Sequence, residues 1–231
     1  MRGLAIPNAG LLTNAAALAA AFVLCVPSIS RAQPRPFTNS RWQWHVAVSG
    51  ALSTYTASHN ESIQDGSLSA VAVQAAKPVF TWRGASFSWL SEALPIMRVT
   101  SGAPPTRVPS PLIDPAEAND PERLARYQLR TGTGIGLAPF GAEGRLPLGR
   151  HADLVVNVTA GAAWFTQVVP YGKATQANFT VAPGVALQHD VGARDALAVG
   201  YALHHLSNAS MGGANPGMNS HLLFVRWARK R

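Results

Sequence analysis

The sequence predicts an all-β fold, namely an eight-stranded antiparallel transmembrane β-barrel of the bacterial outer membrane. Two observations lead to this prediction. Bulky apolar residues alternate with small or polar residues, with a period of two, along several stretches of the chain. Charged residues make up only 13% of the 231 residues, which is about half their usual share in a soluble domain. An apolar segment at the start of the chain agrees with export from the cytoplasm.

We expect residues 1–32 to form a signal peptide and residues 33–231 to form the barrel. Arg2 gives a short positive start, an apolar run extends from Ala15 to Val26, and Ser30 and Ala32 offer the small residues of a cleavage site. The run is shorter than the roughly 20 residues that a membrane-spanning helix needs. The alternative interpretation is a buried core helix. The only cysteine, Cys25, lies in this run, so a disulfide framework is excluded.

Eight alternating segments are expected to be strands: 42–56, 67–82, 85–99, 124–140, 151–168, 175–189, 195–207 and 218–228. In the first of them, Trp42, Trp44, Val46 and Val48 alternate with Gln43, His45, Ala47 and Ser49. The outward face of a soluble sandwich would carry Lys and Glu. A second face of small or uncharged polar residues suits the interior of a narrow barrel, with the bulky face turned to lipid. A soluble barrel is the alternative.

The expected connections alternate between long and short. The long ones are 57–66, 100–123, 169–174 and 208–217, and the short ones are Arg83-Gly84, Glu143–Arg150 and Asp190–Arg194. Outer-membrane barrels have long extracellular loops and short periplasmic turns, so both termini are expected in the periplasm. The basic tail is expected there too: Arg226, Arg229, Lys230 and Arg231. At Pro183, which has no N–H for the ladder, we expect a bulge or a local break.

The seventh segment ends in residues that can carry chemistry. His205 and Ser207 lie in register with Leu203, in the row expected to face lipid. Residues two apart on a strand share a face, with Cα atoms about 6.5–7 Å apart. An imidazole beside a hydroxyl can activate an oxygen nucleophile, and a pair of interfacial polar side chains is the alternative. His204 is expected inside the barrel, and His221 is interpreted as an interfacial side chain.

The formal net charge of +8 indicates an anionic partner, either a nucleic acid or an anionic membrane. The basic residues form no stripe and the chain carries an export signal, so nucleic-acid binding is not expected. The single cysteine excludes a multi-cysteine zinc or iron–sulfur site. We expect no cofactor and no metal ion.

The stretches His205–Ala209 and Asn215–Asn219 resemble the PagL-type lipid A 3-O-deacylase family, also known as acyloxyacyl hydrolase. Asn178–Thr180 and Ala198–Tyr201 resemble it as well, and the resemblance covers about residues 125–230. It implies an eight-stranded outer-membrane barrel that hydrolyses the ester-linked 3-hydroxyacyl chain at position 3 of lipid A without a metal. It also implies a serine nucleophile, a histidine base two residues before it, and an acid on the next strand.

Carried over to this sequence, the resemblance makes Ser207 the nucleophile and His205 the base, and it places the acid at Asn219. An asparagine can orient the imidazole by accepting a hydrogen bond, but it cannot stabilise the imidazolium by charge. Other acids occur in the two long loops: Glu61, Asp65, Asp114, Glu117, Asp120 and Glu122. Candidate oxyanion donors are Asn208, Asn215, Gly212 and Gly213. Candidate phosphate-binding residues are Arg98, Arg107, Arg123, Arg126 and Lys173.

Three functions follow from this sequence. The first is an outer-membrane esterase whose partner is lipid A or lipopolysaccharide, with its site facing the outer leaflet. The second is a non-catalytic barrel that binds lipopolysaccharide or has a structural role, and Asn219 is its main support. The third is a small transport or adhesion barrel, which is disfavoured because side chains fill the lumen of an eight-stranded barrel. The sequence leaves open whether the barrel forms a homodimer.

Overall fold

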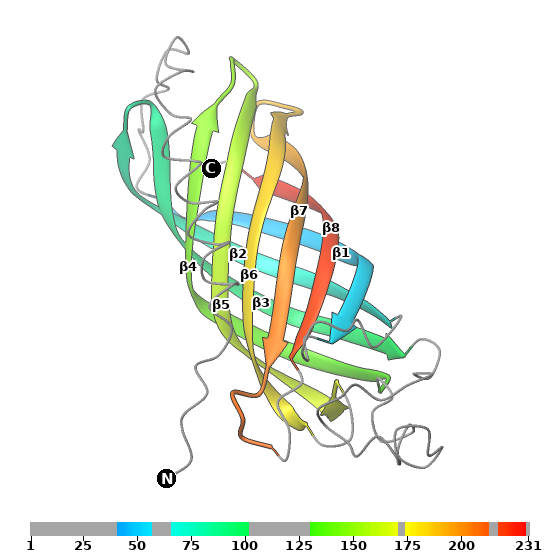
Figure 1. Cartoon of the computed structure of the whole chain (residues 1–231). Helices are drawn as coiled ribbons and strands as arrows, with labels where there is room; N and C mark the ends of the chain where they lie inside the picture. The colour runs from blue at the N-terminus through cyan, green and yellow to red at the C-terminus, as the bar shows by residue number, and fades with distance from the viewer. Residues whose placement is uncertain (1–40, 57–65, 102–129, 171–173, 213–216, 230–231) are drawn as a thin grey trace, which may run out of the picture.

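The computed structural model describes residues 41–56, 66–101, 130–170, 174–212 and 217–229. They form a closed antiparallel barrel in which each strand pairs with its neighbours in sequence, and β8 pairs with β1 (Figure 1). The strands are β1 (Gln43–Thr56), β2 (Gly66–Trp82), β3 (Ala85–Ser101), β4 (Gly132–Pro147), β5 (Ala152–Val169), β6 (Thr175–Asp190), β7 (Asp195–Ser207) and β8 (Met218–Arg229). The predicted eight-stranded barrel is confirmed. The expected signal peptide lies outside the described residues.

The short connections after β2, β4 and β6 lie at one end of the barrel, which we call the short-turn end. Strands β1, β3, β5 and β7 end at the other, which we call the loop end. In Figure 1, β7 (orange) runs from the short-turn end at the top to the loop end at the bottom, beside β8 (red). Within the described part of the chain, no helix is long and apolar enough to span a membrane.

The fourth strand differs from its prediction. The expected strand 124–140 ends too early, because β4 extends over Gly132–Pro147, and residues 124–129 lie outside the described residues. The expected turn at Glu143–Arg150 begins too early for the same reason, since the chain turns only after Pro147. Glu143 and Arg145 lie two residues apart on the inner face of β4, and Nε of Arg145 donates to Oε1 of Glu143 at 2.6 Å. Two charges in a glycine-rich stretch resemble a turn in the sequence, but here they belong to the lumen.

The two faces of the strands confirm the predicted alternation. In β1, the outward side chains of Trp44 and Val48 are 47% and 59% exposed, whereas the inward side chains of His45 and Ala47 are 0% and 7% exposed. Most of the large side chains exposed on the described strands are apolar. This is the arrangement of a barrel whose outside contacts hydrocarbon and whose narrow interior is filled by side chains.

A charged network fills the lumen toward the short-turn end. The guanidinium of Arg226 is 1% exposed, and its Nη1 donates to Oε2 of Glu143 at 2.5 Å. Nη2 of Arg145 lies 3.0 Å from Nε2 of His45. The expectation that Arg226 belongs to a basic periplasmic tail is therefore wrong. Arg226 occupies the inward row of β8, two residues before Ala228, so its place in the alternation indicates its orientation.

The β6–β7 ladder is interrupted at the expected proline. Pairs form up to Val181 with His205 and resume at Gly184 with Ala202, in an unchanged register. On its other side β6 stays paired with β5 through Pro183. Because the register does not shift, the irregularity is a local break rather than a bulge. The break lies directly next to His205.

Candidate active site

His205 and Asn219 lie directly opposite each other on β7 and β8. Both occupy the outward rows of their strands, near the loop end. Nδ1 of His205 lies 2.8 Å from Oδ1 of Asn219. Because a carbonyl oxygen can only accept, Nδ1 carries the proton in this bond and Nε2 of the neutral ring is left as an acceptor. A general base needs this tautomer.

Ser207 ends β7 and lies two residues beyond His205 on the same face. The chain then turns sharply, since Ala209 and Ser210 have φ values of 49° and 64°. The N–H of Ala209 donates to Oγ of Ser207 at 3.3 Å. The serine hydroxyl is thus held at the point where the strand leaves the barrel wall. Hydroxyl, imidazole and amide side chains therefore gather on the outward-facing side of β7 and β8.

Asn208 begins the turn after Ser207. Its side chain is 1% exposed, and its Oδ1 accepts from the N–H of Ser210 at 3.1 Å. Its backbone carbonyl accepts from the N–H of Met211 at 3.0 Å. The side chain and the carbonyl group of Asn208 therefore both hold the turn that follows Ser207. Gly212 follows in the same turn and is half-buried.

Several predicted site residues lie outside the described part of the chain: Asn215, Gly213, Glu61, Asp65, Asp114, Glu117, Asp120, Glu122, Arg107, Arg123, Arg126 and Lys173. Of the candidate phosphate-binding residues, Arg98 is described. It is exposed on the outer side of β3 and pairs with Thr133 of β4 near the loop end.

His204 lies on the opposite side of the wall from His205, inside the lumen, as expected. It is 5% exposed, and its Nε2 lies 2.8 Å from Oγ1 of Thr180, which is 3% exposed. Thr180 belongs to β6 and lies just before the interrupted part of the β6–β7 ladder. This side-chain hydrogen bond therefore links the two strands where backbone pairs are missing.

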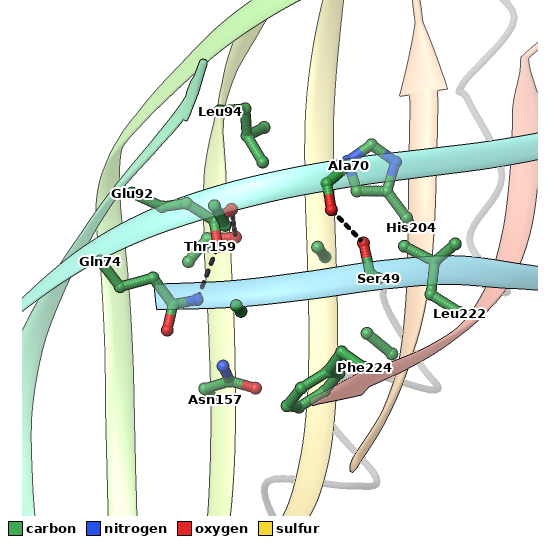
Figure 2. A pocket seen from close by; sticks show the side chains of 14 residues that line it. Ser49, Ala70, Gln74, Glu92, Leu94, Asn157, Thr159, His204, Leu222 and Phe224 are labelled. Atoms are coloured by element: carbon green, nitrogen blue, oxygen red, sulfur yellow. Dashed lines mark hydrogen bonds between the residues drawn. The ribbon is translucent and has the colours of Figure 1, made fainter. Parts of the chain in front are cut away.

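A small cavity of about 60 Å³ lies in the lumen, and His204 forms part of its wall (Figure 2). At its other side, Glu92 accepts from Nε2 of Gln74 at 2.6 Å and from Oγ1 of Thr159 at 3.1 Å. Ser207, His205 and Asn219 do not line this cavity. The candidate site therefore belongs to the outer surface of the barrel and not to its interior.

Sequence reasoning missed a second polar pair on this surface. The hydroxyl of Tyr201 is hydrogen-bonded to Nδ1 of His221, and the ring centroids are 5.8 Å apart with the planes at 35°. In the outward row of β8, His221 is the next residue after Asn219, two positions further along the chain. A signal was present, because both residues are in phase with His205 and Asn219, but the sequence does not reveal that they contact each other.

A protein-family model matches the strands that carry this site. Residues 118–228 match the family described as Lipid A 3-O-deacylase (PagL), and this range contains Tyr201, His205, Ser207, Asn219 and His221. This part of the chain is similar to the PagL family. The predicted resemblance is confirmed. No curated protein matches the chain in sequence.

The comparison with solved structures concerns the fold alone. The crystal structure of the outer membrane enzyme PagL matches with a TM-score of 0.54 at 14% identity, covering 79% of this chain and 97% of that one. Neisserial surface protein A matches with a TM-score of 0.48 at 8% identity, covering 82% and 97%. OprG from Pseudomonas aeruginosa matches with a TM-score of 0.37 at 8% identity, covering 82% and 95%. The match to the PagL structure agrees with the fold of an eight-stranded outer-membrane barrel.

Proposed function

We propose that this protein is an outer-membrane esterase that removes the ester-linked acyl chain at the 3-O position of lipid A. The observation that carries the proposal is the 2.8 Å bond from Nδ1 of His205 to Asn219, beside Ser207, on the lipid-facing side of a PagL-family segment. Polar groups that face lipid cost free energy, so a cluster of them is expected to have a function.

In the proposed reaction, Oγ of Ser207 attacks the ester carbonyl while Nε2 of His205 takes the hydroxyl proton. The tetrahedral intermediate collapses, and His205 returns the proton to the sugar oxygen that leaves. Water then attacks the acyl-serine with His205 again as the base, and the fatty acid is released. Asn219 holds the imidazole in the required tautomer throughout. Asn208, Gly212, Gly213 and Asn215 are the proposed donors to the oxyanion.

Asn219 limits the rate in this proposal. Replacing the aspartate of a serine triad by asparagine can lower the rate about 10⁴-fold, largely because the amide then favours the wrong imidazole tautomer. Here Oδ1 of Asn219 faces Nδ1, as the correct tautomer requires. What Asn219 still lacks is a negative charge beside the imidazolium. We expect this lack alone to lower the rate by less than 10⁴-fold.

The position of the site fits a lipid substrate. Lipid A that diffuses in the outer leaflet could reach Ser207 laterally, without entering the lumen. The net charge of +8 would favour binding of the lipid A phosphates. We propose that the mature barrel lies in the outer membrane after removal of residues 1–32, with its loop end and Ser207 at the outer leaflet.

Mass spectrometry of lipid A from cells that express the wild-type chain would test the proposal. We expect the loss of one acyl chain with the wild type and no loss with Ser207→Ala. Ser210→Ala is the matched control, because Ser210 is an exposed serine of the same turn, and it should behave as the wild type. Equal deacylation by Ser207→Ala, with the barrel folded, would refute the serine mechanism.

Asn219 also favours a second candidate function, a barrel that binds lipopolysaccharide without cleaving it. In that case lipid A would stay intact with the wild type, and the purified barrel would still bind lipopolysaccharide. Binding that weakens on Ser207→Ala or His205→Ala, without any cleavage by the wild type, would support this alternative.

A further inference from the structure

The exposed positive charges of the described strands and turns lie mainly at the end of the barrel away from Ser207. At the loop end, the exposed basic residues of the described part are Arg98 and Arg130. The short-turn end has a larger set, which we call the basic rim: Arg41, Lys77, Arg83, Arg150, Arg194 and Arg229. The described carboxylates at this end are buried or half-buried: Asp153, Asp190 and Asp195. A reaction at Ser207 does not account for the basic rim.

Lys77 differs from the other rim residues because it lies within the apolar outward surface of β2. Val73 lies before it in the same outward row, and Val79 and Phe80 beyond it are 66% and 54% exposed. A charge on such a surface costs free energy unless a partner of opposite charge offsets it. Within the described part of the chain, Lys77 forms no ion pair with a carboxylate. Its ammonium is therefore open to an anionic ligand.

Two tryptophans frame this ammonium. Nζ of Lys77 lies 5.8 Å from the ring centroid of Trp42, which is within the range of a cation–π interaction. On its other side, Lys77 pairs with Trp89 across the β2–β3 ladder. Trp42 and Trp89 are 42% and 45% exposed, so both rings face outward beside the lysine. We call Trp42, Lys77 and Trp89 the Lys77 site.

The depth of the Lys77 site matches one edge of the apolar band. Near the loop end, Ser69 of β2 pairs with Arg98 of β3, and both are exposed. Lys77 lies eight residues further along β2 than Ser69, which corresponds to about 26 Å along the strand. With the usual strand tilt of about 40°, this is about 20 Å along the barrel axis. The apolar band of such barrels is about 25 Å tall, with tryptophan and tyrosine at both edges. The Lys77 site therefore lies near the edge opposite the loop end.

We propose that the Lys77 site binds the phosphate group of an anionic phospholipid in the periplasmic leaflet of the outer membrane. The ammonium of Lys77 donates to the phosphate oxygens, and the two indole rings pack against the glycerol and the first acyl carbons. The basic rim attracts the negatively charged headgroup from a distance. This inference rests on the proposed orientation of the barrel and not on the esterase reaction.

Native mass spectrometry of the full barrel in detergent would test the site, with dioleoylphosphatidylglycerol or dioleoylphosphatidylcholine as the added lipid. Both lipids contain the phosphodiester, but choline neutralises its charge. We expect the wild type to bind the first phosphatidylglycerol at least about fivefold more tightly than phosphatidylcholine. Lys77→Gln should weaken phosphatidylglycerol binding about fivefold, the usual contribution of one basic residue at an anionic membrane surface.

Two further variants control for charge and position. Lys77→Arg retains the positive charge and should keep most of the affinity for phosphatidylglycerol. Arg130→Gln removes the same charge from an exposed residue at the loop end, and it should bind phosphatidylglycerol as the wild type does.

Three results would overturn the proposal. The first is equal affinity of the wild type for the two lipids, or equal weakening by Lys77→Gln and Arg130→Gln. The second is weaker binding of purified lipid A by Lys77→Gln with unchanged phosphatidylglycerol binding, which would make the ligand a glycolipid. The third is loss of a dimer in Lys77→Gln with unchanged lipid binding, which would assign Lys77 to a contact between two copies. Because lipid binding is measured without hydrolysis, failure of this site and failure of the esterase are seen separately.

Discussion

The imidazole of His205 and the side-chain amide of Asn219 face each other across the β7–β8 ladder, with Nδ1 and Oδ1 2.8 Å apart. Asn219 is 4% exposed, so water does not compete strongly for this bond. The contact determines both which ring nitrogen carries the proton and how the ring is directed. In the proposed mechanism it supplies the orientation of a catalytic triad without the charge.

Restoring the charge should therefore raise the rate. Asn219→Asp has the same shape, and its carboxylate can accept from Nδ1 of His205 and stabilise the imidazolium. A hydrogen bond to a charged group exceeds a neutral one by about 1–1.5 kcal/mol, which corresponds to about a tenfold higher kcat for deacylation. The measurement is the initial rate of fatty acid release from lipid A.

Asn208→Asp is the matched control for this gain. It makes the same chemical change at a residue that is 1% exposed in the turn after Ser207. A negative charge beside the developing oxyanion should lower kcat rather than raise it. If both variants raise kcat equally, the gain comes from the overall charge and the specific role of Asn219 is refuted.

The bond between Thr180 and His204 should matter for the rate although neither residue reaches the lipid face. It links β6 and β7 where the ladder is interrupted beside His205. Thr180→Val keeps the shape and removes the hydroxyl. The lost bond corresponds to about 0.5–1.5 kcal/mol, and we expect kcat to fall about threefold to tenfold with KM little changed.

Thr180→Ser, which retains the hydroxyl, should restore kcat. Urea unfolding of both variants separates positioning from stability. If Thr180→Val lowers the unfolding free energy and leaves the kcat of the folded protein unchanged, the bond only stabilises the barrel.

Much of this fold could be predicted from the sequence, because lipid and a narrow lumen impose opposite demands on alternate residues. The faces of His205, Ser207 and His204 follow from that alternation. Which residues pair across neighbouring strands is harder to predict from the sequence, because it depends on the register of the strands and on the closure of the barrel. Asn219 opposite His205 came from the family resemblance, and the contact of Tyr201 with His221 was not predicted.

The luminal charges show where alternation alone fails. Glu143 and Arg226 come from β4 and β8, far apart in sequence, and only barrel closure brings them together. Near glycines and prolines, a charge that will be neutralised in the lumen cannot be distinguished from a charge in a turn. This is why the predicted end of the fourth strand was wrong.

Glu143 and Arg226 should stabilise the barrel only when both side chains are present. Glu143→Leu leaves the guanidinium groups of Arg226 and Arg145 in the lumen without their shared carboxylate, which typically costs about 3–5 kcal/mol. The double variant Glu143→Leu/Arg226→Met also removes the more deeply buried of the two guanidinium groups and should recover part of that loss. Urea unfolding followed by tryptophan fluorescence gives the three free energies. A double variant as unstable as the sum of the single variants would contradict this.

The close contact of β5 with β4 at Gly161 should make this glycine irreplaceable. A Cβ at this position would lie 2.1 Å from the carbonyl oxygen of Leu137 and 2.3 Å from Cα of Ala138. Both are backbone atoms beside the register shift of β4, so they cannot move aside as a side chain would. Gly161→Ala should lower the unfolding free energy by about 1–3 kcal/mol or prevent folding. Gly50→Ala is the control, because its Cβ would have no atom within 4 Å, and it should fold as the wild type. Equal urea midpoints for both variants would show that β4 yields at this contact.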